Sequence, residues 1–207
     1  MEILIRKNLG LLIAMCLVIN VNAQDIKQIQ KAFEDSYKLE KEAEYKKAAD
    51  KLKGVYQADS YEINLRLGWL NYQAGLFTES ISHYQRAVDL LPMSHEAKFG
   101  LVLPLAAMGK WDEVAVIYKK ILETSPNNTI ANYRLGLIFY GKEDYLKAYE
   151  KFKKVVDLYP FDYDGLIMYA WTNLKLGKNR EASILFNKVI MYNPGDASAL
   201  EGLSYIK

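Results

Sequence analysis

The chain has 207 residues, of which 51% are hydrophobic and 25% are charged, with a formal net charge of only +2. This length is sufficient for one or two domains, and the near balance of charge argues against nucleic-acid binding, which needs a concentrated positive field. Cys16 is the only cysteine, which excludes an internal disulfide and a cysteine-based zinc cluster.

The first 23 residues have the pattern of a signal peptide. Arg6 and Lys7 precede an apolar run from Leu9 to Ile19, and residues 21–23 read Val-Asn-Ala, a suitable cleavage site. The run is shorter than the roughly 20 residues that span a bilayer. We therefore expect residues 1–23 to be cleaved after Ala23. An uncleaved anchor is the alternative, whereas a lipoprotein acceptor at Cys16 is disfavoured because no small residue precedes it.

Residues 24–60 predict a divergent pair of helices. Apolar residues fall three or four apart on each helix, as expected for two helix faces. They are Ile26, Ile29, Phe33 and Tyr37 on the first, and Tyr45, Ala48, Leu52 and Val55 on the second, after a turn at residues 40–44. The other face is rich in Lys, Glu and Asp, which is typical of a terminal capping repeat.

Four prolines then mark a fixed period. Pro92, Pro126, Pro160 and Pro194 stand 34 residues apart. A period between 20 and 50 residues is typical of stacked supersecondary units, and proline disfavours helix in the residue before it. We therefore expect four units, 61–94, 95–128, 129–162 and 163–196, each with two helices and a tight turn. Residues 197–207 predict one further capping helix, with Leu200, Leu203 and Ile206 on one face.

The residues between the prolines resemble the tetratricopeptide repeat (TPR) family. One unit carries Leu67, Gly68, Gly75, Phe77, Tyr84, Ala87 and Pro92, and another carries Leu135, Gly136, Tyr145, Ala148, Phe152 and Pro160. The resemblance implies an all-α fold, a right-handed superhelical solenoid of antiparallel helix pairs with about five repeats. Small residues such as Gly68 let two helices approach, and Tyr84, Tyr118, Phe152 and Phe186 are expected to fill the space between units.

The third unit departs from this pattern. Val102 stands where the other units have Gly or Ala, and Pro104 lies in the middle of a predicted helix. Proline removes one backbone hydrogen bond and clashes with the carbonyl four residues back, here that of Gly100. We expect a kink over residues 100–104. It is either a tolerated irregularity or a device that reshapes the binding surface.

The TPR resemblance implies a concave groove lined by the first helix of each unit. Its fifth, ninth and twelfth positions form an apolar and aromatic strip, hereafter the groove strip. Its residues are Leu65, Trp69, Tyr72, Phe99, Leu103, Tyr133, Leu137, Tyr140, Ile167, Trp171 and Leu174, with Ala106 beside them and Glu62, Glu96 and Asp164 along one margin. Family members that clamp a terminal carboxylate carry Lys and Asn at the positions of Leu65 and Trp69. We therefore do not expect this chain to recognise a terminal carboxylate.

The groove strip predicts a site for an apolar or amphipathic segment of a partner protein, with Trp69 and Trp171 as anchors. Internal packing and self-association into homo-oligomers are the alternatives. No phosphate-loop, dinucleotide or nucleophile motif occurs, and His83 and His95 are expected to be solvated rather than metal ligands. We thus expect a non-enzymatic scaffold without cofactor, metal, nucleic acid or transmembrane segment in the mature chain. The exported, cysteine-free TPR pattern favours a bacterial, periplasmic or envelope-associated location.

Overall fold

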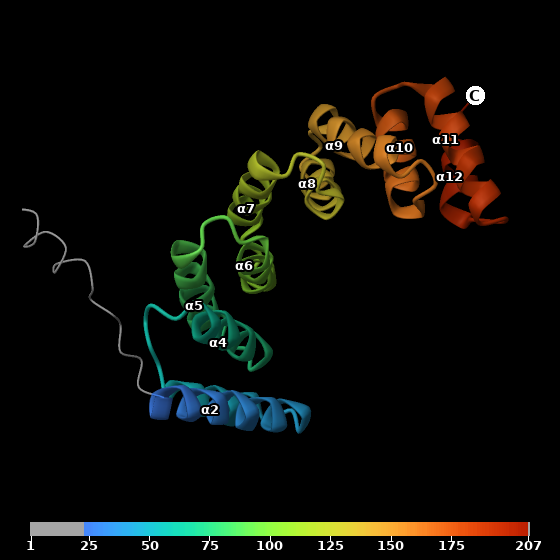
Figure 1. Ribbon diagram of the computed structural model, residues 1–207. Helices are drawn as coiled ribbons and strands as arrows, with labels where there is room; N and C mark the ends of the chain where they lie inside the picture. Colours follow the sequence, from blue (N-terminus) through green and yellow to red (C-terminus); the bar gives the residue numbers. More distant parts are fainter. Residues whose placement is uncertain (1–22, 207) are drawn as a thin grey trace, which may run out of the picture. The chain divides into compact units, whose positions relative to one another are not determined.

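The computed structural model describes residues 23–206, and the predicted signal peptide therefore lies outside the described residues except for Ala23. Within that range the chain folds into eleven α-helices without a strand (Figure 1). The all-α prediction is confirmed. The chain divides into two compact units, one ending at Gln57 and the other beginning at Ala58. None of the described helices combines the length and the apolar character that crossing a membrane requires.

The N-terminal unit is a pair of helices, α2 (Ala23–Lys41) and α3 (Tyr45–Lys53). Ala43 in the connecting turn has a positive φ of 58°. Ala48 and Leu52 are buried on α3, as expected from the sequence. The predicted face of α2 is partly wrong, because Ile26 and Tyr37 are exposed while the small residues Ala32 and Ser36 are buried.

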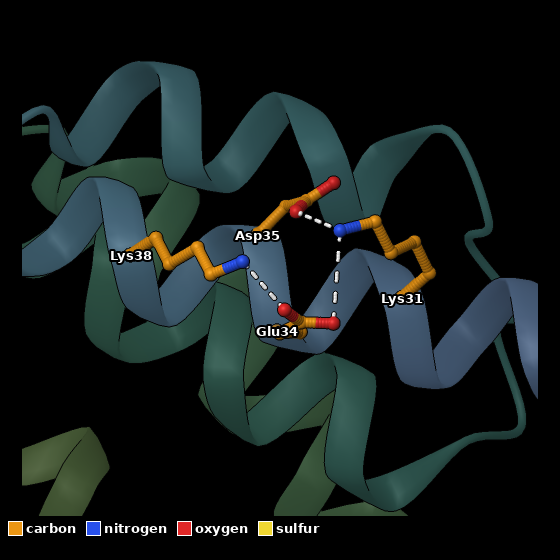
Figure 2. A network of polar contacts seen from close by, with 4 residues as sticks. All are labelled: Lys31, Glu34, Asp35 and Lys38. Atoms are coloured by element: carbon orange, nitrogen blue, oxygen red, sulfur yellow. Dashed lines mark hydrogen bonds and ion pairs between the residues drawn. The ribbon is translucent and has the colours of Figure 1, made fainter.

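The polar face of α2 carries a chain of ion pairs (Figure 2). The Lys31 Nζ lies 2.7 Å from an Asp35 oxygen and 3.6 Å from a Glu34 oxygen, and the Lys38 Nζ lies 2.5 Å from the other Glu34 oxygen. These pairs hold the pKa of the Glu34 and Asp35 carboxyls below their usual values, chiefly through the lysine hydrogen bonds. All four side chains are exposed to solvent or partly so, and such pairs add little to stability.

The second unit holds nine helices, and each packs against the next one along the chain (Figure 1). The first helices of its repeats are α4 (Tyr61–Gln73), α6 (His95–Ala107), α8 (Thr129–Gly141) and α10 (Tyr163–Lys175). The second helices are α5 (Phe77–Leu90), α7 (Trp111–Thr124), α9 (Tyr145–Leu158) and α11 (Asn179–Tyr192). The final helix, α12 (Ala197–Ser204), packs on α10 and α11.

Each first helix of this unit, and α12, begins at a polar side chain that accepts a hydrogen bond from a backbone N–H three residues on. The capping residues are Ser60, Ser94, Asn128, Asp162 and Asp196. Such caps satisfy donors that the helix itself leaves open. This explains why every first helix starts at the residue that the proline period predicts.

A second polar contact ties each of three first helices to the turn before it. Asn132 Nδ2 donates to the Pro126 carbonyl at 3.0 Å and to the Asn128 carbonyl at 2.9 Å. Asn64 and Lys98 donate in the same way to the carbonyls of Ala58 and Pro92. These bonds fix the turn between neighbouring repeats.

Replacing Asn132 by Ala is expected to lower the free energy of unfolding by about 1–2 kcal/mol, because two turn carbonyls lose their buried donor. Urea denaturation followed by circular dichroism measures the change. Asn127→Ala, at an exposed site in the same turn, is the matched control and should leave stability within about 0.5 kcal/mol. Equal stabilities of the two variants would contradict this role for Asn132.

Large rings lie over glycines inside the second and fourth repeats. A Cβ on Gly68 would lie 2.7 Å from the Tyr84 ring, and one on Gly136 would lie 2.7 Å from the Phe152 ring. Tyr84, Tyr118, Phe152 and Phe186 are all buried, and Tyr84 and Phe186 reach the helix after their own repeat, at Gly100 and Gly202, as predicted. The glycines are required here because any side chain would hold the two helices of the repeat apart.

The two helices of the third repeat, α6 and α7, pack less closely than the two helices of the second, fourth and fifth repeats. Val102 and Val114 occupy the two positions where the second repeat has Gly68 and Ser80 and the fourth has Gly136 and Ala148. Among the first helices and α12, the contact between α4 and α6 is the most extensive, and that between α6 and α8 is less extensive than that of any other neighbouring pair. Helix α6 nevertheless continues through Pro104 without a break.

Candidate protein-interaction site

The groove strip lies on the first helices α4, α6, α8 and α10. Every member of it is half-buried except Ile167, whose side chain is 8% exposed and belongs to the core around Phe186. Half-burial means that each side chain packs on its repeat and still presents apolar surface. Ile167 is better described as core than as a contact residue.

The two predicted anchors are integrated into the fold to different degrees. The Trp69 ring lies 6.0 Å from the Tyr72 ring, which in turn lies 5.9 Å from Phe77. Trp171 packs edge-on against Phe186 at 5.2 Å, and its Nε1 donates to the Ser198 Oγ at 2.8 Å. Trp171 therefore also holds α12 in place, and truncating it would disturb the fold as well as any binding.

Two hollows interrupt the groove strip. The larger, hereafter the anchor pocket, has a volume of about 690 Å³ and is lined by Tyr72, Leu103 and Leu137 of the strip, together with Ala106. The smaller, hereafter the C-terminal pocket, has a volume of about 510 Å³ and is lined by Tyr140, Trp171 and Leu174. Leu65, Trp69, Phe99, Tyr133 and Ile167 line neither of these two pockets.

Several lining residues were not anticipated from the repeat positions. Trp111, Val114 and Tyr118 reach the anchor pocket from the second helix α7, and Glu201 and Tyr205 reach the C-terminal pocket from α12 and the residue that follows it. The fifth, ninth and twelfth positions describe first helices only, so they could not identify these residues. Val102 was the available signal, since it predicts a gap beside α7.

The charged residues that line the anchor pocket, among those described, are both basic. Arg134 lies on α8, and Lys142 is the residue that follows this helix. Lys142 forms an ion pair with Asp112 of α7, and this contact holds the pKa of the Asp112 carboxyl below its usual value. Burial raises the pKa of the Tyr118 hydroxyl above its usual value.

Both histidines are more ordered than the sequence suggested. His83 Nδ1 lies 3.1 Å from the Asn64 Oδ1, and His95 Nε2 lies 3.0 Å from the Thr124 Oγ1. Each ring is half-buried and keeps contact with solvent, and the His95 hydrogen bond lies at an exposed position. Among residues 23–206, no three His, Cys, Asp or Glu side chains are grouped as a metal ion would require.

Comparison with known proteins identifies the repeat. The tetratricopeptide repeat profile matches residues 39–95 and 99–163, which is more than half of the chain. The chain belongs to the tetratricopeptide repeat family. Tetratricopeptide arrays generally act as protein-interaction scaffolds, and this general role is supported for the chain. The matched residues lie in both compact units and include all of α3 and, except for residues 96–98, the irregular third repeat.

Two curated proteins share the repeat region. Human protein O-mannosyl-transferase TMTC1 is 29% identical over 160 residues, and the match covers 72% of this chain but 18% of the transferase. The BBSome complex member BBS4 of Bos taurus is 24% identical over 156 residues, covering 72% of this chain and 28% of its own. The chain thus spans less than a third of either relative.

Solved structures agree with the fold. A tetratricopeptide repeat protein from Parabacteroides merdae superposes with a TM-score of 0.74 at 19% identity, over 87% of this chain and 72% of that one. A MamA protein gives a TM-score of 0.70 at 20% identity, over 80% and 91%. MamA from Desulfovibrio magneticus gives 0.68 at 18% identity, over 82% and 97%. At these identities the likeness concerns the fold.

Proposed function

We propose that this chain is a non-enzymatic adaptor that holds an apolar or amphipathic segment of another protein along the groove strip. The observation that carries the proposal is the half-buried apolar strip with its two pockets on consecutive first helices. An apolar surface of this kind on a soluble protein is typical of an interaction site, and an amphipathic helix in an apolar groove is a recurrent recognition mode.

We further propose that the chain acts in a bacterial envelope complex, with residues 1–23 as its export signal. The basic Arg6 and Lys7, the apolar run that follows and the small Ala23 support this location. Nucleic acid is not among the proposed partners, since the net charge is close to zero. Self-assembly into homo-oligomers through the same strip is the competing function, and light scattering of the full chain separates the two.

The proposal is tested with the double variant Leu103→Glu and Leu137→Glu, which places charge in the anchor pocket. We expect cross-linked pull-downs from the native envelope to lose the partner by at least about tenfold, because desolvating two carboxylates opposes docking of an apolar segment. The unfolding transition of the variant, followed by circular dichroism, verifies that it remains folded.

The matched control is Val116→Glu with Leu146→Glu, two apolar residues of the second helices that are 49% and 68% exposed. It introduces the same charge at sites outside the groove strip and should retain the partner. A partner that stays bound to the folded Leu103→Glu and Leu137→Glu variant, or that is lost with the control, would overturn the groove assignment.

A further inference from the structure

The anchor pocket exists because the helices of the third repeat do not pack as closely as those of the second and fourth repeats. Tyr84 and Phe152 lie over glycines of their own repeats, with ring atoms 2.7 Å from the position of a Cβ. In the third repeat the equivalent ring is Tyr118, and Val102 stands at the position of those glycines; the Tyr118 ring packs at a tilt against Phe99 at 6.3 Å. The added volume of Val102 separates α6 from α7, and the space continues between α6 and α8, which do not pack closely.

This pocket has room for more than one side chain. Its volume of about 690 Å³ lies in the range of specific ligand sites, roughly 300–1,000 Å³. Its floor is apolar, with Leu103 and Ala106 on α6, Leu137 and Ile138 on α8, and Val114 on α7. An amphipathic helix presents apolar side chains three or four residues apart on one face, so two of them can enter together.

The charged residues that line the pocket determine which charge a docked segment can carry next to its apolar side chains. Arg134 and Lys142 are the lining residues that carry charge in the described chain, and both are cationic. The counterion of Lys142 is Asp112, whose side chain is 91% exposed and can leave the contact at little cost. A carboxylate on a docked segment can therefore take the place of Asp112 and also reach Arg134.

We propose that the anchor pocket recognises an acidic amphipathic segment of another protein, in which two large apolar side chains one helical turn apart enter the pocket and a neighbouring Asp or Glu pairs with Arg134 and Lys142. This inference rests on the proposed function and specifies the chemistry of its partner. The looseness of the third repeat is then the feature that gives the array its specificity, because the tighter second and fourth repeats have glycine at the position of Val102.

The probe is a phage-displayed library of random peptides of roughly 15 residues, about four helical turns, selected on the full chain. We expect the enriched peptides to carry paired large apolar residues with Asp or Glu within one turn of them. Labelled synthetic copies are then titrated by fluorescence anisotropy. Raising salt from about 0.05 to 0.5 M should weaken their binding, since rim charges are screened.

Three variants locate the contact. Arg134→Glu with Lys142→Glu and, separately, Ala106→Trp, which fills the pocket, should each weaken the peptide by about tenfold or more. Lys120→Glu with Arg180→Glu changes the net charge equally at exposed sites outside the pocket and should alter affinity by less than about twofold. A peptide whose acids are replaced by Lys should bind the Arg134→Glu and Lys142→Glu variant better than it binds the native chain, which a purely structural role of these residues would not produce.

The outcomes separate this inference from the proposed function. Peptides lost with Leu174→Glu, in the C-terminal pocket, but unaffected by Ala106→Trp or by charge reversal would preserve groove binding and overturn the anchor pocket. Apolar peptides without acids, bound independently of salt, would overturn the acidic partner. If the enriched peptides instead matched a segment of this chain and light scattering showed dimers, the occupant of the pocket would be a second copy of the chain. The proposal of another protein as partner would then be overturned. Failure to enrich any peptide would overturn both proposals.

Discussion

Phe152→Ala is expected to lower the free energy of unfolding by about 3–5 kcal/mol. Phe152 is fully buried, its ring covers Gly136 on α8, and the Tyr133 ring lies 5.9 Å away. Removing the ring loses its transfer free energy and leaves a cavity between two helices that meet through it. Because Gly136 has no side chain, it cannot fill the part of the cavity that faces it.

Urea denaturation followed by circular dichroism measures this loss as a lower midpoint. Leu146→Ala on the same helix is the matched control, since this leucine is 68% exposed and should change stability by less than about 0.5 kcal/mol. A loss below about 1 kcal/mol for Phe152→Ala would show that the fourth repeat does not depend on the ring for its closure.

The effect should also spread beyond one repeat. Helix α9 packs against α8 and α10, and α10 packs against α11 and α12. In a repeat array each unit gains its stability from its neighbours, so a weakened interface lowers the stability of the units on both sides. Hydrogen exchange should therefore show lost protection in α8 to α10 before α4 and α5 respond.

Most of the fold could be predicted because short sequence features mark where each repeat begins and ends. Pro92, Pro126, Pro160 and Pro194 set the period, and a capping side chain marks the start of each first helix, as Asn128 does for α8. The predicted starts at residues 61, 95, 129, 163 and 197 are those of α4, α6, α8, α10 and α12. Local backbone chemistry decides these positions, so one sequence is sufficient to find them.

The candidate site was harder to predict because it depends on how far helices stand apart. Val102 could be recognised as an exception, but its consequence, the pocket reached by Trp111 from α7, depends on packing between repeats. Ile167 shows the opposite case, since a position expected to face the partner is core. The face of α2 was misassigned because Ile26 and Tyr37 follow a helical spacing without being buried.

The second large effect is expected at Gly100, which lies four residues before Pro104 on α6. A Cβ there would stand 2.2 Å from the Tyr84 Cε1, closer than real contacts allow. The Tyr84 ring is 3% exposed and also covers Gly68, at 2.7 Å from the position of that Cβ, so it cannot move away from Gly100 without disturbing its own repeat. The second and third repeats are therefore joined by one ring held between two glycines.

Gly100→Val is accordingly expected to lower the free energy of unfolding by about 2–3 kcal/mol through overpacking. Helix propensity alone predicts the opposite sign, since Val is more favourable than Gly in a helix by a few tenths of a kcal/mol. Gly141→Val is the matched control, because Gly141 also lies on a first helix and a Cβ there meets nothing within 4 Å. Urea denaturation should show a loss for Gly100→Val and a small gain or no change for Gly141→Val. If both variants were as stable as the native chain, the Tyr84 ring would have to be free to move, and the close contact between α5 and α6 at Gly100 would not constrain the fold.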